Sequence, residues 1–159
     1  MPALPLRAEL GFLLRMSHSK AARAFNEALE PLAIEGRHFG VLMMLDRQGP
    51  LIQSRLTAEL HSDKSAMVRT VDDLERLGYV TREPVAGDRR ARTVTLTDLG
   101  RERHAAGRRL ANGAGEVVFA RFTEEELLSL RDLLRRFVDE REQPWDSSHP
   151  PSASSSTRP

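Results

Sequence analysis

Residues 62–99 read SDKSAMVRTVDDLERLGYVTREPVAGDRRARTVTLTDL, and the fold class can be inferred from this stretch. Its first half predicts a helix, because its apolar side chains recur at the spacing of one helix face. These side chains are Met67, Val71, Leu74 and Leu77. Ser62 or Asp63 can cap the free amide groups of the first turn. Gly78 is of the residue type that most often ends a helix, so we expect the helix to lie between these limits.

The second half of the stretch predicts a two-stranded β-ribbon with a cationic tip. Tyr79–Glu83 and Arg92–Leu96 are short runs rich in valine and threonine, which favour strands. The segment between them, Pro84–Arg90, contains proline, glycine and aspartate, which favour a loop. Three arginines fall within residues 89–92. A cationic loop beside a helix with a polar N-terminal half is suited to contact with DNA.

The composition excludes several classes of function. The chain has 159 residues, which suits one domain with an extension, and 40% of them are apolar. Basic and acidic residues nearly balance, 24 against 23, so net charge alone does not indicate a nucleic-acid partner. The absence of cysteine excludes disulfides, thiol catalysis and thiolate zinc sites. The N-terminus lacks the apolar run of a signal peptide or membrane helix, so we expect a cytoplasmic protein without a membrane partner.

Helical patterns precede the ribbon. An apolar stripe predicts a helix over about residues 6–29, and Pro31 ends it. Residues 36–47 predict a short buried helix with a Gly-Pro stop behind it. A second short helix is expected over about residues 53–61. Two short helices joined by a tight turn and followed by a ribbon are the winged form of the helix-turn-helix.

Two further helices are expected after the ribbon. The first runs from residue 97 to about residue 122 and contains four glycines, which weaken it by roughly 1 kcal/mol each relative to alanine. Packing must therefore hold this helix. Thr123 and Glu126 form a capping box at the start of the last helix.

We predict a mostly α, α+β fold with a winged helix-turn-helix lobe at residues 36–97. Helices at residues 6–32 and 98–142 flank the lobe, and residues 1–142 form a single domain. The first helix is apolar on more than one side, so we expect the flanking helices to form a dimer contact. Residues 143–159 are largely proline and serine and too poor in apolar residues to fold, so we expect a disordered tail.

The chain resembles the MarR family of transcriptional regulators. The matching residues are Asp63-Lys64-Ser65, Val68-Arg69, Val71 to Gly78, Val80, Arg82, Asp88 to Ala91, Val94, Leu96, Thr97 and Gly100. The resemblance implies an obligate homodimer that binds a pseudo-palindromic operator in double-stranded DNA, usually as a repressor. It also implies release by a small-molecule effector, often aromatic or anionic. No cofactor is expected.

Base contacts should come from the N-terminal half of the helix that follows Ser62, because three carboxylates in its C-terminal half repel phosphate. Lys64, Ser65 and Arg69 then remain as candidate contacts with bases or phosphates. Ser54, at the start of the preceding helix, suits a phosphate or serves only as a helix cap. An ordinary solvated helix face is the alternative interpretation.

The wing carries the second group of candidate DNA contacts. In the resembling family the wing aspartate positions the arginine two places on, which corresponds to Asp88 and Arg90. A ribbon tip can reach the narrow, electronegative minor groove. Arg89 then suits a phosphate or a local contact, and Arg92 should lie in the returning strand. A solubilising charge cluster is the alternative.

A ligand site is expected in the cleft that the family resemblance implies between the dimer helices and the reading lobe. Its candidate residues are Ser17, His18 and Arg23 in the first helix and Arg37 and His38 in the second. Such side chains can hold a carboxylate or a phenolate. A buried histidine or a local ion pair is the alternative. Metal is not expected, because no two histidines lie four residues apart.

Two other classes of function compete with DNA binding. A winged-helix protein-interaction module without operator specificity is compatible with the near-zero net charge. An enzyme is not expected, because the sequence has no nucleophile elbow, phosphate-binding glycine loop or metal-ligand spacing.

Overall fold

The computed structural model describes residues 4–85 and 87–139, apart from the side chains of residues 88–90 and 139. By its internal contacts the chain divides after Ala120 into two units. The first unit contains the helices α1 to α5 and a small sheet, and the second contains α6.

Two helices open the first unit. α1 covers Leu6–Leu29, as predicted, and α2 covers Gly36–Gln48. The proline stop lies in the short 3-10 helix η1 (Glu30–Leu32), which separates them. α2 begins with a reciprocal cap: the side chain of Glu35 accepts a hydrogen bond from the backbone N–H of His38, and the His38 ring accepts one from the backbone N–H of Glu35. Both free amide groups are thereby satisfied.

The helix-turn-helix consists of α3 (Gln53–Glu59) and α4 (Lys64–Arg76). α3 ends two residues earlier than predicted, because the turn passes through His61 with a φ of 46°. Of the two predicted caps, Asp63 is the one used. Its Oδ1 accepts a hydrogen bond from the backbone N–H of Ala66 at 2.8 Å.

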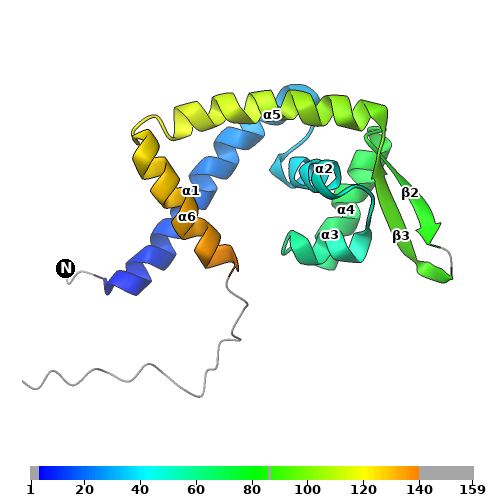
Figure 1. The fold of residues 1–159 in the computed structure, drawn as a ribbon, viewed down its shortest axis with the longest axis horizontal. Helices are drawn as coiled ribbons and strands as arrows, with labels where there is room; N and C mark the ends of the chain where they lie inside the picture. Colours follow the sequence, from blue (N-terminus) through cyan, green and yellow to red (C-terminus); the bar gives the residue numbers. More distant parts are fainter. Residues whose placement is uncertain (1–3, 86, 140–159) are drawn as a thin grey trace, which may run out of the picture. The chain divides into compact units, whose positions relative to one another are not determined.

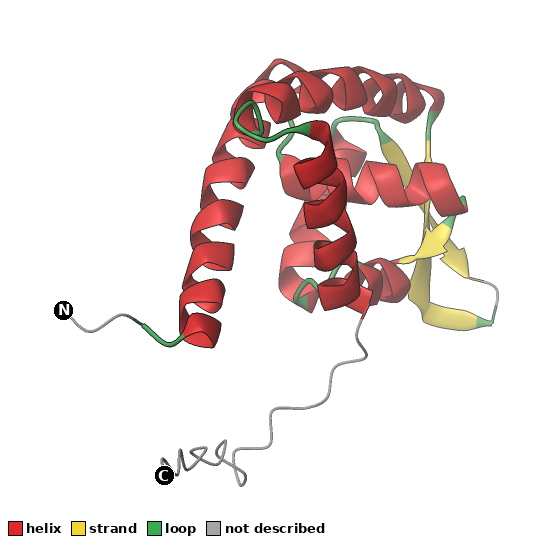
Figure 2. Ribbon diagram, turned by 60° about the vertical axis from the view of Figure 1, so that its left-hand side comes forward, coloured by secondary structure: helices red, strands yellow, loops and turns green. Residues whose placement is uncertain are grey.

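A three-stranded antiparallel sheet lies beside these helices, with the strand order β1-β3-β2 (Figure 2). β2 covers Val80–Val85 and β3 covers Asp88–Leu96. β1 is the two-residue strand Leu51–Ile52, which pairs with the inner end of β3. This strand was not predicted, because two residues are too few to show a strand period.

The long strands extend further toward the wing tip than predicted. The pairing continues past Pro84 to a last pair between Val85 and Asp88, with an irregularity in register between Pro84 and Val85. The prediction of a loop over Pro84–Arg90 is therefore wrong for most of that segment, where the ladder overrides the local turn preference. Gly87, with a φ of 83°, lies in the turn.

α5 (Asp98–Val118) crosses the first unit and packs along α1 and α2 (Figure 1). Two of its glycines are required by close contacts. A Cβ on Gly100 would lie 1.9 Å from the backbone oxygen of Tyr79, and one on Gly107 would lie 2.9 Å from the ring of Phe39. These glycines therefore allow α5 to approach the lobe.

α5 ends at Val118, earlier than the predicted limit near residue 122. The last helical hydrogen bond runs from the backbone N–H of Phe119 to the backbone oxygen of Gly115, at 2.9 Å. At the other end, α5 begins one residue after the predicted start, because Thr97 is its cap: Oγ1 of Thr97 accepts a hydrogen bond from the backbone N–H of Gly100 at 2.9 Å.

The core of the first unit is apolar, and α4 contributes its predicted stripe. The largest fully buried side chains are Leu29, Leu42, Leu56, Leu74, Val41, Val71, Val80 and Val94. Tyr79, next to the sheet, donates its hydroxyl hydrogen to the backbone oxygen of Leu32 at 3.1 Å, so its one buried polar group is satisfied.

The second unit is described through α6 (Glu124–Asp139). The predicted capping box is confirmed: the N–H of Thr123 donates to Glu126 Oε2 at 2.8 Å, and the N–H of Glu126 donates to Thr123 Oγ1 at 3.2 Å. The tail predicted for residues 143–159 lies outside the described residues. Among the described helices, none combines the length and the apolar character needed to cross a membrane.

The close approach of Gly100 to the backbone of Tyr79 predicts that an added methyl group destabilises the fold. Gly100→Ala should lower the free energy of unfolding by about 1–3 kcal/mol, because the new Cβ meets backbone that cannot rotate away. Urea unfolding measures the change. Gly113→Ala is the matched control, since nothing lies within 4 Å of its Cβ position. It should be neutral or stabilise by up to about 1 kcal/mol. Equal effects of the two variants would contradict the packing argument.

Candidate nucleic-acid interface

The outer face of α4 contains the predicted base-contacting residues. Lys64, Ser65 and Arg69 are all exposed there, together with Val68. The opposite face is buried in the core. The structure therefore brings the three predicted residues to one accessible side of the N-terminal half of the helix.

A crevice of about 530 Å³ lies beside this face. Its lining comes from the start of α3, from α4 and from β3: Ile52, Gln53, Ser54, Thr57, Lys64, Val68, Ala91 and Arg92. Ser54, predicted as a phosphate contact, and Lys64 therefore border the same hollow. Ser65 and Arg69 lie on the adjoining surface of α4 and are not part of the lining.

The C-terminal half of α4 is acidic, and its carboxylates are paired. Arg82 on β2 contacts Asp72 at 2.6 Å and donates from its Nε to Glu75 at 3.0 Å. The hydrogen bond from Arg82 holds the pKa of Glu75 below its usual range. In turn, the bond to Glu75 raises the pKa of Arg82. Asp72 and Glu75 are therefore paired within the lobe.

Asp73, the third carboxylate of this half, joins α4 to α2. Its oxygens accept from Arg76 at 2.9 Å and from His38 Nε2 at 3.3 Å, and Arg37 lies 3.6 Å away. The hydrogen bonds from Arg76 and then from His38 hold the pKa of Asp73 below its usual range. Arg37 also pairs with Glu35 at 3.1 Å.

The His38 ring is buried and held at both nitrogens. Because Nδ1 accepts from the backbone N–H of Glu35 at 2.9 Å, the ring hydrogen lies on Nε2 and points to Asp73. Burial lowers the pKa of His38, although the hydrogen bond to Asp73 acts in the opposite direction. His38 is thus a neutral structural group in this arrangement.

The wing residues are described by their backbone only. Residues 88–90 belong to β3, at the end of the ladder that adjoins the turn. The side chains predicted to contact DNA there, those of Asp88, Arg89 and Arg90, lie outside the described part of the structure. Arg92 lies in the returning strand, as predicted, and is exposed.

The remaining predicted ligand residues lie on α1. Ser17, His18 and Arg23 are exposed, and Arg23 pairs with Glu27 at 3.8 Å. The structure does not bring these three residues into a described pocket with Arg37 and His38. Their role as a ligand site stays a prediction.

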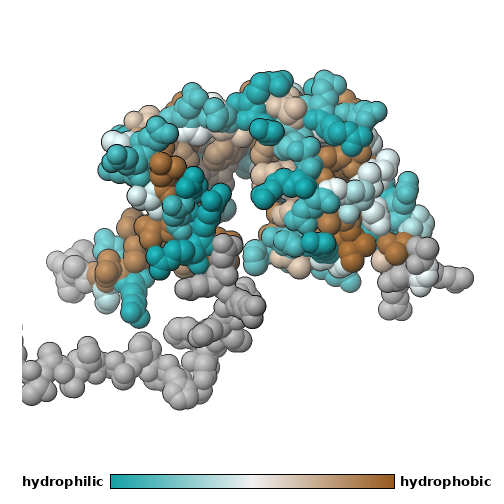
Figure 3. Space-filling view, viewed as in Figure 1, coloured by the Kyte–Doolittle hydropathy of each residue, from teal (hydrophilic) through white to brown (hydrophobic). Residues whose placement is uncertain are grey.

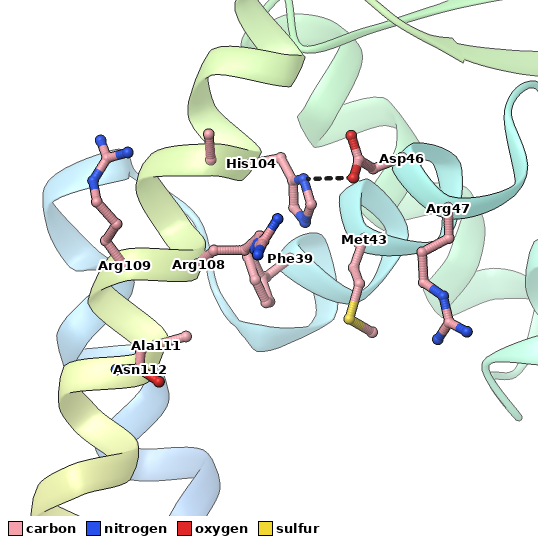
Figure 4. Close-up of a pocket in the computed structure, with 10 residues that line it drawn as sticks. Phe39, Met43, Asp46, Arg47, His104, Arg108, Arg109, Ala111 and Asn112 are labelled. Carbon is pink, nitrogen blue, oxygen red and sulfur yellow. Dashed lines mark ion pairs between the residues drawn. The ribbon is translucent and has the colours of Figure 1, made fainter.

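A pocket of about 840 Å³ lies instead between α2 and α5 (Figure 4). It is lined by Phe39, Met43, Asp46, Arg47, His104, Ala105, Arg108, Arg109, Ala111 and Asn112. Figure 4 shows the His104 ring facing Asp46, and the two groups are 3.5 Å apart. The His104 ring also packs against the ring of Phe39, with 5.5 Å between the two ring centroids.

The other ring nitrogen of His104 distinguishes this pocket. His104 is 3% exposed, and its Nε2 has no hydrogen-bond partner among the described residues. The sequence carried a partial signal, because Phe39, Met43 and Asp46 recur at i, i+4 and i+7 on α2. Sequence spacing could not show that this face meets His104 and Arg108. No group of three or more side chains placed to hold a metal occurs among the residues described.

The helix-turn-helix of α3 and α4, followed by the β2–β3 wing, is the architecture of winged helix-turn-helix regulators of transcription that bind DNA. Residues 34–91 match the MarR family. The chain is 30% identical over 124 residues to the HTH-type transcriptional regulator PecS of Dickeya dadantii (strain 3937). The aligned region covers 72% of this chain and 70% of PecS. This chain belongs to the MarR family.

Solved structures agree with this assignment. A MarR-family transcriptional regulator from Rhodococcus sp. RHA1 has a TM-score of 0.80 and 26% identity, over 87% of this chain and 99% of that one. A mutant MarR from E. coli, complexed with operator DNA, has a TM-score of 0.74 and 29% identity, over 85% of this chain and 99% of that one. The relatives are transcriptional regulators and not enzymes.

The Arg82 pairs predict a pH-dependent loss of stability. Glu75 has a lowered pKa in the folded chain, so its contribution is complete above pH 4.5, its ordinary value, and is lost as pH falls through the lower folded value. Arg82→Gln should lower the free energy of unfolding at pH 7 by about 1–2 kcal/mol, a figure limited by solvent screening. It should also flatten the pH dependence below 4.5. Urea unfolding at pH 7 and under acid conditions measures both.

Arg101→Gln provides the matched control for this variant. Arg101 donates to Asp98, whose side chain is 99% exposed, so the pair is screened by water, and its second contact, from Nη1 to the backbone oxygen of Leu96, is long at 3.3 Å. Its removal should cost less than about 0.5 kcal/mol. If Arg82→Gln lowers the free energy of unfolding no more than Arg101→Gln does, the structural role of the Arg82 pairs is contradicted.

Proposed function

We propose that this protein is a homodimeric repressor that binds a pseudo-palindromic operator and is released by a small aromatic or anionic ligand. The observation that carries the proposal is the exposed group of Lys64, Ser65 and Arg69 on α4, beside the crevice that contains Ser54. The operator complex of the E. coli relative supports the same kind of partner. We keep the cytoplasm as the expected location.

The N-terminal half of α4 would enter the major groove. In helix-turn-helix proteins this end of the recognition helix lies nearest to the base edges. Arg69 suits guanine, whose O6 and N7 accept both hydrogens of a guanidinium edge. Lys64 would contact a base, Ser65 a base or a phosphate, and Ser54 a phosphate.

The wing would enter the flanking minor groove. The β2–β3 ladder carries the backbone of residues 88–90 to the wing tip, at the opposite end of the ribbon from α5 (Figure 1). Arg90, oriented by Asp88, would lie in the groove, where the potential of narrow A·T-rich DNA attracts arginine. Arg89 would contact a phosphate.

The terminal helices would form the dimer contact. Both carry large apolar side chains that are at least one-third exposed, and Figure 3 shows apolar surface where α1 begins. They are Leu6, Leu10, Phe12, Leu13, Leu14 and Met16 on α1, and Leu128, Leu133, Leu134, Phe137 and Val138 on α6. A second copy would cover the same surface on each subunit, as twofold symmetry requires.

Selection of bound fragments from a genomic library tests the proposal, followed by variants on the selected DNA. The fragments should share two inverted half-sites about one helical turn apart. Arg90→Ala should weaken binding broadly by about 1–3 kcal/mol, and Arg69→Ala should also relax the sequence preference. Fluorescence anisotropy at fixed salt measures the dissociation constants.

Arg101→Ala is the control, because its charge lies on α5 and pairs with Asp98. Its binding should match that of the wild type. If no inverted repeat is enriched, the winged-helix interaction module becomes the better description. If neither Arg69→Ala nor Arg90→Ala changes affinity, the docking geometry is wrong.

The pocket between α2 and α5 is the better-formed candidate for the effector site. Phe39 and Met43 supply apolar wall, and Arg47 and Arg108 supply positive charge. The buried Nε2 of His104 offers a polar group that no described residue satisfies. A hydroxylated aromatic carboxylate would meet all three requirements, since its ring suits the apolar wall, its carboxylate the arginines, and its hydroxyl group can donate to Nε2.

Benzoate and its hydroxylated derivatives are suitable probes of this pocket. The measurement is the probe concentration that releases half of a labelled operator. Arg108→Gln should raise that concentration by roughly tenfold or more, because it removes a charge-assisted hydrogen bond. His18→Ala, on α1, should respond as the wild type does. If His18→Ala raises that concentration and Arg108→Gln does not, the effector site is instead the one predicted from the sequence. Its residues are Ser17, His18, Arg23, Arg37 and His38.

A further inference from the structure

Val68 is an apolar side chain on the polar face of α4. It is 37% exposed, whereas Met67, Val71 and Leu74 on the inner face are at most 2% exposed. Core packing therefore does not require a valine at this position. Helix formation does not require it either, because a β-branched residue is a poorer helix former than lysine, arginine or glutamate.

The surroundings of Val68 combine apolar wall with a cationic rim. Ile52, itself 40% exposed, and Ala91 line the same crevice. Lys64, one turn earlier on α4, and Arg92 on β3 bring positive charge to it. No carboxylate is among the described residues that line the crevice. This chemistry is complementary to a polyanion that presents an apolar group.

Double-stranded DNA presents one such group on its base edges in the major groove, the 5-methyl group of thymine. A valine placed against guanine, adenine or cytosine would leave their hydrogen-bonding groups without partners. Against thymine it gains an apolar contact instead. An exposed valine on a reading helix is thus able to discriminate between base pairs.

We propose that Val68 selects a T·A pair in each half-site by packing against the thymine 5-methyl group. The inference rests on the proposed docking of α4 in the major groove. Val68 follows Lys64 by four residues, a rise of about 6 Å along the helix, and base pairs are about 3.4 Å apart. The selected thymine should therefore lie within about two base pairs of the base that Lys64 or Arg69 contacts.

Replacement of thymine by deoxyuridine tests the contact, because it removes the 5-methyl group alone. Each thymine of the selected operator is replaced in turn, symmetrically in both half-sites. Anisotropy titration with the full-length protein then gives each dissociation constant. One symmetric pair of positions should weaken wild-type binding about fourfold per methyl group, or roughly 15-fold for both half-sites.

Val68→Ala should remove this dependence. With the shorter side chain, the same replacement should change affinity by less than about twofold, whereas Val68→Ile should keep the preference for thymine. Val117→Ala is the matched control, since Val117 is 79% exposed on α5 and borders neither described pocket. It should respond to deoxyuridine as the wild type does.

Two results would overturn the inference while leaving the proposed function intact. In the first, no replacement weakens wild-type binding although Arg69→Ala does. In the second, Val68→Ala lowers affinity equally for the thymine and deoxyuridine operators, which would mean that Val68 supports the fold without reading a base. A protein that enriches no palindrome and shows no dependence on Arg69 would fail the proposed function itself, and this inference with it.

Discussion

The guanidinium group of Arg82 joins the wing to the recognition helix, and the charge of the reading face depends on it. Without this group, Asp72 and Glu75 would leave the C-terminal half of α4 more negative. With it, both carboxylates are paired with one residue of the wing strand, and the negative charge there is reduced by one. The chain as a whole has a net charge of only +1. Negative charge on α4 is paired locally, so the distribution of charge matters more here than its sum.

The parts of the fold that depend on local chemistry were predictable from the sequence. Asp63, with Ser62 as the alternative, and Thr123 were recognised as caps because a cap requires only a side-chain oxygen and the amide groups that follow it. The helix periods were likewise visible. The errors fall where distant segments meet. β1 exists only because β3 lies beside it, and the wing strands extend because each supplies the other's hydrogen bonds. The glycines of α5, counted as weaknesses, include two positions at which another segment leaves no room for a Cβ.

The candidate site was likewise predictable where it depends on one helix, and not where distant segments meet. The exposed position of Lys64, Ser65 and Arg69 follows from the helix period, so it could be predicted. The partner of His38 could not, since Asp73 lies 35 residues away and the contact exists only in the folded lobe. Val68 was not predicted as a DNA contact, because an apolar side chain carries no charge or hydrogen-bonding group for a phosphate or a base edge. Its exposure has meaning only once the burial of the inner face is known.

α2 connects the two candidate sites of the first unit. One face of α2, with Phe39 and Asp46, borders the pocket against α5, while His38 at its start hydrogen-bonds to Asp73 on α4. Because Nδ1 of His38 accepts from the backbone N–H of Glu35, Nε2 carries the ring hydrogen, and the bond to Asp73 forms with a neutral ring. The middle of α2 is buried in the core, and close-packed interiors transmit displacement rather than absorb it. A ligand that fits the pocket better in one placement of α2 would therefore also favour one placement of α4. The ligand could shift that equilibrium only by the difference between its affinities for the two placements. The unsatisfied nitrogen of His104 is one group that can supply such a difference, because it gains a partner only when the pocket is occupied by a polar ligand or by water.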